Sequence, residues 1–74
     1  MKTYSLRFYC RRPRSESWDW IDFKAFTDKG AIKKAKRIVT KWNKYYSGEF
    51  RLLRIVRALK DGGYKFIWQR ENKK

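Results

Sequence analysis

The sequence contains no histidine and a single cysteine, and these absences exclude several kinds of catalytic and metal site. No Ser/His or Cys/His pair is available for nucleophilic catalysis, and no Cys/His set is available for zinc. Cys10 has no partner in the chain for a disulfide, which favours a reducing compartment. No glycine-rich phosphate-binding loop occurs either. We therefore expect a protein that is not an enzyme, with no catalytic residue, cofactor, metal or small-molecule substrate.

Acidic residues are also scarce. The chain has 7 Asp and Glu against 21 Lys and Arg, a formal net charge of +14 in 74 residues. The few acids are dispersed, so we expect no convergent set of the kind that a Mg²⁺-dependent nuclease needs. Self-repulsion on this scale opposes the compact state, and an anionic partner would relieve it. The charge therefore favours nucleic acid, an acidic protein surface or an anionic membrane as the partner.

Long apolar runs are missing as well. No run approaches the length of a membrane span, and the N-terminal residues alternate instead of forming the apolar block of a signal peptide. The amphipathic helix described below could lie on a membrane surface, but its apolar face is needed to cover the sheet. We therefore expect a cytoplasmic protein with no membrane partner.

Hydrophobic patterning predicts a single basic domain over residues 1–74. Alternation with a period of two predicts strands over 3–10 and 18–26, and β-forming residues predict two more over 49–60 and 64–70. Residues 28–46 have helical spacing. The predicted order is ββαββ, so the fold class is α+β, an antiparallel sheet with one helix packed across one face.

Local signals predict where the helix and the turns lie. Thr27 or Asp28 is the expected N-cap of the helix, and Gly48 is its expected left-handed C-cap. Pro13 and its small polar neighbours predict a loop over 11–17.

The second half of the sheet has two further signals. The irregular phase of the third strand predicts a bulge near residues 52–53. Asp61 and Gly62 predict a two-residue hairpin turn. That turn would pair Leu59 with Tyr64, Arg57 with Phe66 and Ile55 with Trp68.

The stretch "TKWNKYYSGEF", residues 40–50, concentrates aromatic rings beside lysines. Trp42, Tyr45 and Tyr46 fall on the same helical stripe as Ile38 and Val39, so we expect them to be mainly core. Phe50 begins a strand and is expected to pack as well.

The opposite face of the predicted helix is basic. No acid occurs between Asp28 and Glu49, although an ordinary solvated face would use Glu–Lys pairs at this spacing. We interpret it as a surface for an anionic partner, with a merely solvated face as the alternative. The residues expected to contact the partner are Lys29, Lys33, Arg37 and Lys41 in one row, with Lys36 and Lys44 beside them. The predicted loop adds Arg11, Arg12 and Arg14.

The sheet face away from the helix mixes aromatic rings with arginine. The best register of the second strand buries Ile21 and leaves Trp18 and Trp20 on the open face with Arg7 of the first strand. A bulge near Ile21 would bring Trp20 inward instead. Such a face is typical of proteins that stack single-stranded bases. The alternatives are that these rings pack among themselves or that they form a homodimer contact.

Two runs of the sequence resemble small phage anti-CRISPR proteins of the type I-F class. They are "FKAFTDKGAIKKAKRIV" and "SGEFRLLRIVRALKDGGYKFIWQRE", and the first carries the helical segment Ala35-Lys36-Arg37-Ile38. The resemblance implies a sheet packed on one helix and a protein that occupies the CRISPR surveillance complex and blocks target DNA. It also implies that Lys36 and Arg37 contact that complex, in the cytoplasm of the phage's host.

The residues themselves favour a non-catalytic nucleic-acid-binding protein that contacts phosphates through the basic helix and the arginine loop. The alternative is an anti-CRISPR inhibitor that binds a nucleic-acid-binding protein complex. An inhibitor with a charge of +14 would need acidic patches or the bound nucleic acid itself, so direct binding is the preferred hypothesis. The choice between DNA and RNA, the sequence preference and the oligomeric state stay open.

Overall fold

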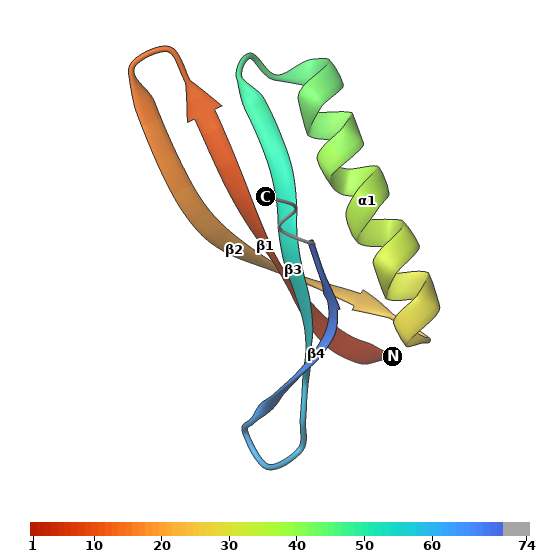
Figure 1. Ribbon diagram of the computed structural model, residues 1–74. Coiled ribbons are helices and arrows are strands. Elements are labelled where there is room, and N and C mark those ends of the chain that lie inside the picture. Colours follow the sequence, from red (N-terminus) through yellow and green to blue (C-terminus); the bar gives the residue numbers. More distant parts are fainter. Residues whose placement is uncertain (71–74) are drawn as a thin grey trace.

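The fold is a four-stranded antiparallel sheet with one helix across one face (Figure 1). The computed structural model describes residues 1–70. The elements are β1 (Lys2–Arg12), β2 (Ser15–Ala25), α1 (Asp28–Tyr45), β3 (Glu49–Ala58) and β4 (Tyr64–Gln69). In the sheet they follow the order β2-β1-β3-β4. This confirms the predicted ββαββ order and the α+β class.

β1 and β2 form a long hairpin whose turn is tighter than predicted. Arg12 pairs with Ser15, so only Pro13 and Arg14 form the turn. The loop predicted over 11–17 is therefore wrong. Proline sets φ for the first turn position, and exposed polar residues are tolerated in the strands beside it. The register of the hairpin is continuous, so there is no bulge near Ile21.

The core lies between α1 and the sheet face beneath it. Alternate residues of β1, such as Tyr4 and Leu6, are fully buried there. Small residues of the helix, Ala31 and Ala35, are fully buried too, which lets the helix lie close to the strands. The sheet face away from α1 has no covering layer within the described residues 1–70 (Figure 1).

The two ends of α1 are formed differently. Thr27 is the N-cap, and its Oγ1 accepts a hydrogen bond from the Gly30 backbone N–H at 3.0 Å. At the other end the C-cap is Tyr46 in an extended conformation, so the prediction that Gly48 caps the helix is wrong. Gly48 has φ of 106°, and a Cβ there would lie 2.8 Å from the carbonyl oxygen of Arg11. This glycine lets the turn after α1 pass close to the first hairpin.

The aromatic end of α1 is less buried than predicted. Trp42 is half-buried and packs edge-on against Phe8, with ring centroids 4.8 Å apart, and against Phe50 at 5.6 Å. Tyr45 and Tyr46 are 66% and 59% exposed, so their assignment to the core is wrong. Tyr45 lies on the flank of the apolar stripe, and Tyr46 has already left the helix.

β3 contains the predicted bulge, with Leu53 as its extra residue, since Arg7 pairs with Arg54 and Phe8 with Leu52. The hairpin to β4 differs from the prediction. Its loop has three residues, 60–62, because the Leu59 N–H donates to the Gly63 carbonyl at 2.8 Å.

The longer loop shifts the pairing of β3 with β4 by one residue near the turn. Tyr64 therefore pairs with Ala58, and Phe66 pairs with Val56, so two of the three predicted pairs are wrong. A second irregularity, at Ile67, restores the predicted pair of Ile55 with Trp68. As a result Trp68 packs against the core, whereas Phe66 lies on the open face.

Candidate nucleic-acid interface

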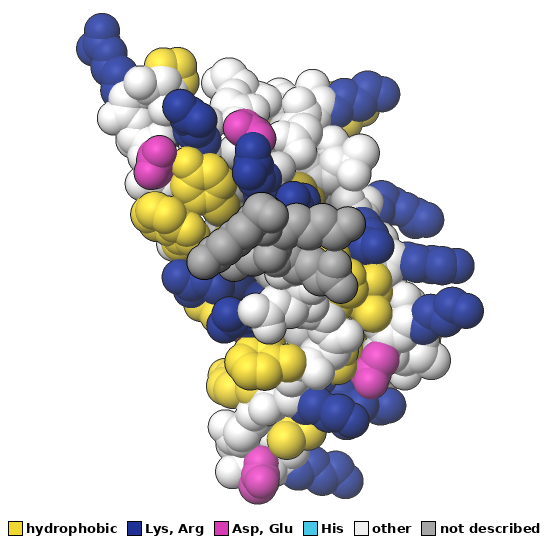
Figure 2. Space-filling view, in the orientation of Figure 1, with side chains coloured by type: hydrophobic (Ala, Val, Ile, Leu, Met, Phe, Trp, Pro, Cys, Tyr) yellow, Lys and Arg dark blue, Asp and Glu magenta, His cyan; other side chains and the backbone are white. Residues whose placement is uncertain are grey.

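The outer side of α1 presents a row of basic side chains, which we call the basic helix face. It consists of Lys29, Lys33, Arg37, Lys41 and Lys44, and all five are exposed. Figure 2 shows Lys and Arg side chains projecting along the edge of the molecule that α1 forms. Successive members four residues apart are neighbours on a helix. The structure therefore brings the predicted row together on one surface.

No acidic side chain of the described residues neutralises the basic helix face. Asp28, the helix's one acid, turns toward the sheet and accepts hydrogen bonds from the Tyr4 hydroxyl at 2.7 Å and from Arg57 at 3.1 Å. Within residues 1–70 the salt bridges are Arg57–Asp28 and Arg51–Glu49, and neither includes a lysine of α1. The positive charges of the face are thus available to an anion.

Two further lysines of α1 lie on its flanks. The Nζ atom of Lys36 lies 5.5 Å from the centre of the Trp68 ring, on the β4 side. Lys34 donates to the carbonyl oxygen of Lys24 at 2.9 Å, on the β2 side. Lys36 and Arg37, the pair implied by the family resemblance, therefore differ in their surroundings: Lys36 packs on a ring, and Arg37 is on the outer row.

The three arginines of the first hairpin do not form one cluster. Arg12 lines a hollow with Trp42 and Tyr46, next to the C-terminal end of α1. Lys41 lines a second hollow that shares the same two rings, so Arg12 and Lys41 both lie at the aromatic end of α1. Arg11 lies opposite Glu49 of β3 in the backbone register, and Arg14 lies in the turn. Strand alternation places Arg11 on the same face as Arg7, away from the helix.

The open sheet face carries pairs of rings and arginines, as the sequence predicts for β1 and β2. The Arg7 guanidinium lies 5.2 Å from the centre of the Trp20 ring, and the rings of Tyr9 and Trp18 are 5.2 Å apart. Trp18 is 54% exposed and Trp20 is 39% exposed, so both rings are accessible.

β3 and β4 add a pair that was missed in the sequence. The Arg54 guanidinium lies 5.0 Å from the centre of the Phe66 ring. The bulge at Leu53 places Arg51 and Arg54 on the same face although they are three residues apart. Arg57, another three residues on, turns to the helix side and Asp28. Arg51, Arg54 and Arg57 are three residues apart in the sequence. That spacing alone does not predict which of them lie on the same face of the sheet.

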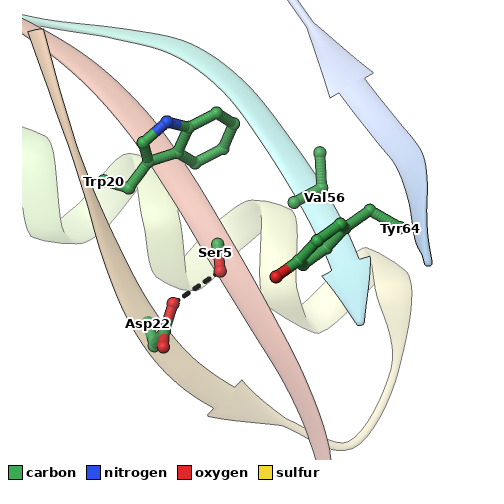
Figure 3. Close-up of a pocket in the computed structure, with 5 residues that line it drawn as sticks. All are labelled: Ser5, Trp20, Asp22, Val56 and Tyr64. Carbon is green, nitrogen blue, oxygen red and sulfur yellow. Dashed lines mark hydrogen bonds between the residues drawn. The ribbon is translucent and has the colours of Figure 1, made fainter. Parts of the chain in front are cut away.

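A hollow of about 360 Å³ opens on this face (Figure 3). It is lined by Ser5, Trp20, Asp22, Val56 and Tyr64. The Ser5 hydroxyl donates to Oδ1 of Asp22 at 2.6 Å. The hollow thus combines two aromatic rings, Trp20 of β2 and Tyr64 of β4, with the hydrogen-bonded pair of Ser5 and Asp22.

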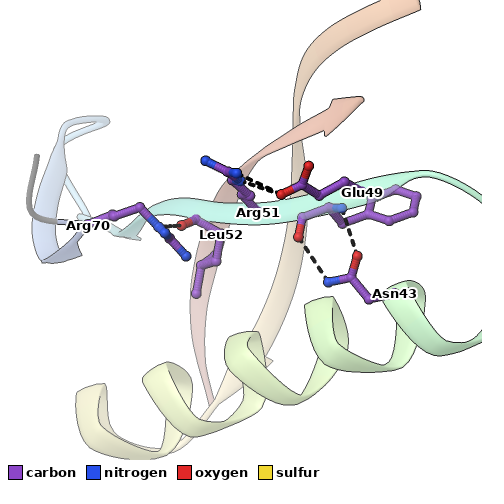
Figure 4. A network of polar contacts seen from close by, with 6 residues as sticks. Asn43, Glu49, Arg51, Leu52 and Arg70 are labelled. Carbon is purple, nitrogen blue, oxygen red and sulfur yellow. Dashed lines mark hydrogen bonds and ion pairs between the residues drawn. The ribbon is translucent and has the colours of Figure 1, made fainter. Parts of the chain in front are cut away.

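The edge of β3 beyond the end of β4 is closed by side chains (Figure 4). The Asn43 amide donates to the Phe50 carbonyl at 2.9 Å and accepts from the Phe50 N–H at 2.8 Å. The Arg70 side chain donates to the Leu52 carbonyl at 3.3 Å, and its backbone N–H donates to the Leu53 carbonyl at 3.0 Å. Asn43 therefore hydrogen-bonds to β3 as a neighbouring strand would.

Comparisons with known proteins add no relative: no protein-family model, curated protein or solved structure matches this chain. The resemblance to anti-CRISPR proteins therefore stays a prediction. Within residues 1–70, no group of His, Cys, Asp and Glu is arranged to hold a metal ion. No helix within residues 1–70 is long and apolar enough to cross a membrane.

Proposed function

We propose that this protein is a non-catalytic nucleic-acid-binding protein whose affinity comes mainly from contacts between the basic helix face and phosphates. The observation that carries the proposal is the row from Lys29 to Lys41, which has no acidic partner among the described residues. The row extends over about 18 Å at 1.5 Å per residue. Lysine and arginine repeated along such a length suit the regularly spaced charges of a nucleic-acid backbone.

The electrostatic energies support the same proposal. Each like-charged i,i+4 contact costs about 0.2–0.5 kcal/mol in a free helix, so the row opposes folding when no anion is present. A polyanion removes this repulsion and releases its own counterions on binding. Arg12 and Lys41 line separate hollows that share Trp42 and Tyr46, so a further positive charge lies near this end of the row. Sequence-independent, salt-sensitive binding is the expected result.

Inhibition of a CRISPR surveillance complex is the alternative that the family resemblance supplies. It would use part of the same surface, since Arg37 belongs to the basic helix face. A protein target would have to offer acidic patches to a chain of charge +14, whereas nucleic acid offers phosphates directly. A pull-down from lysate, with and without nuclease, distinguishes the two. Capture lost on nuclease treatment supports the proposal, and one stoichiometric protein that survives nuclease overturns it.

The direct test is a salt titration of binding to duplex DNA and to single strands. If about six phosphates of a duplex are engaged, the plot of log K against log salt has a slope near −5. Replacing Lys29, Lys33, Arg37 and Lys41 by Gln should reduce that slope by up to about four and weaken binding to every sequence. Absence of binding by the parent protein at low salt would overturn the proposal.

A matched control separates the basic helix face from charge in general. Lys2, Lys24, Lys60 and Lys65 lie outside α1 and are exposed. Replacing these four by Gln makes the same change in net charge, and we expect a smaller loss of slope and affinity. Equal losses in the two variants would show that net charge alone, and not the helix row, produces the binding.

A further inference from the structure

The open sheet face holds a second potential site, in the hollow between β2 and β4. Trp20 and Tyr64 line the hollow on opposite sides, Asp22 lies on the same strand as Trp20, and Ser5 of β1 lies between the two sides (Figure 3). Its volume of about 360 Å³ lies toward the lower end of the range for small-ligand sites, roughly 300–1,000 Å³. Rings that line a hollow can stack on a flat, aromatic ligand.

The polar pair in the hollow determines which edge such a ligand presents. The Ser5 hydroxyl donates to Oδ1 of Asp22, and no described residue hydrogen-bonds to Oδ2 of Asp22. An ionised carboxylate accepts hydrogen bonds and donates none. The ligand therefore has to offer N–H groups. Among the nucleobases, guanine presents two adjacent donors, N1–H and the 2-amino group, to one carboxylate.

The charges around the hollow favour an anionic ligand over a cationic one. Arg7 stacks on Trp20 beside the hollow, and Arg54 stacks on Phe66 of the same face. Neither guanidinium has a salt bridge within residues 1–70. A free cation would be repelled by a chain of charge +14. In a nucleic-acid strand, a base can occupy the hollow while the phosphates contact the two arginines.

The geometry also distinguishes single strands from the other occupants of an open sheet face. The bases of a duplex are stacked and paired, so none is free to lie between Trp20 and Tyr64. A second copy of the chain would bring Arg7 and Arg54 of the two faces together, and the net positive charges of the two copies would repel. An unpaired strand has free base edges and supplies the phosphates.

We propose that the open sheet face binds single-stranded nucleic acid and that the hollow selects guanine. In this arrangement the base lies between Trp20 and Tyr64, Asp22 accepts from its Watson–Crick edge, and Arg7 contacts a neighbouring phosphate. This proposal rests on the proposed function, since it presumes that the protein binds nucleic acid. It adds that the nucleic acid is single-stranded and that the preferred base is guanine. The basic helix face determines neither.

The test uses fluorescence anisotropy with labelled nine-nucleotide strands of thymidine that carry one central substitution. We expect the strand with a central guanine to bind about 5–150-fold more tightly than all-thymidine, the range for a bidentate base contact. 7-Deazaguanine keeps the same Watson–Crick edge and should bind like guanine. Inosine lacks the 2-amino group and should lose part of the preference.

Asp22→Asn is the matched protein variant, because it removes the charge and keeps an oxygen that can accept from Ser5. It should abolish the preference for guanine, so that the ratio of affinities for the guanine strand and for all-thymidine falls to about one. Asp19→Asn is the control: it makes the same change in charge on the same strand, with the side chain on the opposite face. That variant should keep the preference. Equal preferences in Asp22→Asn and the parent protein would overturn the proposal.

Trp20→Ala provides a second measurement, with circular dichroism to confirm that the variant folds. Loss of one base-stacking ring should weaken binding of the guanine strand about 5–150-fold. If the parent protein binds strands without any preference for guanine, this proposal fails and the proposed function stands. If it binds no strand or duplex, both fail. A dimer that Trp20→Ala dissociates, with no strand bound by the parent protein, would assign the face to a second copy.

Discussion

Asp28 connects three parts of the molecule at the N-terminal end of α1. The expected role as an N-cap belongs to Thr27, and the Asp28 carboxylate instead joins Tyr4 of β1 to Arg57 of β3. The hydrogen bond from the Tyr4 hydroxyl lowers the pKa of Asp28, and the Arg57 charge lowers it further, against the opposing effect of burial. Burial and the bond to Asp28 raise the pKa of Tyr4. The cluster therefore favours an ionised Asp28 and a neutral Tyr4.

This cluster predicts an acid-sensitive contribution to stability. Because the pKa of Asp28 is lower in the folded protein, its contribution is full above the ordinary carboxyl range near pH 4 and is lost as the pH falls through the lowered value. Asp28→Asn should lower the melting temperature at pH 7 by several degrees, corresponding to about 1 kcal/mol for partly exposed bonds. The difference between variant and parent should shrink as the pH falls from 5 to 2.

The pH series needs a control carboxylate outside the cluster. Asp19 is exposed and hydrogen-bonds only to the neighbouring Trp20 backbone among the described residues. Asp19→Asn should leave the pH dependence of the melting temperature close to that of the parent protein. A difference between Asp28→Asn and the parent that stays constant from pH 7 to pH 2 would contradict the role assigned to the ionised carboxylate.

At the scale of elements, α1 was the part most readily predicted, because its apolar spacing and its cap at Thr27 are local signals. The open face of β2 was predicted too, since Trp18 and Trp20 follow simple alternation. The pairing of β4 was not, because it depends on a three-residue loop and on the irregularity at Ile67, which no local signal marks. The hollow escaped prediction for the same reason: Tyr64 comes to it only through that pairing.

The basic row also makes a prediction about α1 itself. Replacing Lys29, Lys33, Arg37 and Lys41 by Gln removes three like-charged contacts, which together cost about 1 kcal/mol at low ionic strength. Glutamine has nearly the same helix propensity as lysine and arginine. We therefore expect a melting temperature in the absence of nucleic acid that is higher by a few degrees, measured by circular dichroism at 222 nm. A lower melting temperature would mean that these side chains stabilise the fold through contacts of their own.

At the scale of the whole molecule, charge and size act together. The described chain measures 40 × 26 × 22 Å. The screening length of water is about 30 Å at 0.01 M salt and about 10 Å at 0.1 M. At the lower concentration most of the positive charges therefore repel one another across the molecule, whereas at the higher one only neighbours interact. Because the chain carries a formal charge of +14, screening should have a large effect on its stability.

We therefore expect the melting temperature to rise as sodium chloride is raised from 0.01 M to 0.3 M. A sulfated polyanion at low salt should raise it as well, since an anion that binds the folded state stabilises it by mass action. Calorimetry of the parent protein and of the two quadruple glutamine variants tests this. Both variants should show a weaker salt dependence than the parent. A melting temperature that is independent of salt would show that self-repulsion is already balanced within the fold.

The side chains that cover the edge of β3 connect the protein's tendency to aggregate with the C-terminal end of its helix. An unpaired strand edge invites another chain to add a strand, which is the first step of fibril growth. Here one amide, on Asn43 in the last turn of α1, occupies both the N–H and the carbonyl of Phe50. When that turn unwinds, the same event that shortens the helix opens the sheet to strand addition. We therefore expect fraying of the helix end to expose the backbone of Phe50 at the β3 edge to another chain.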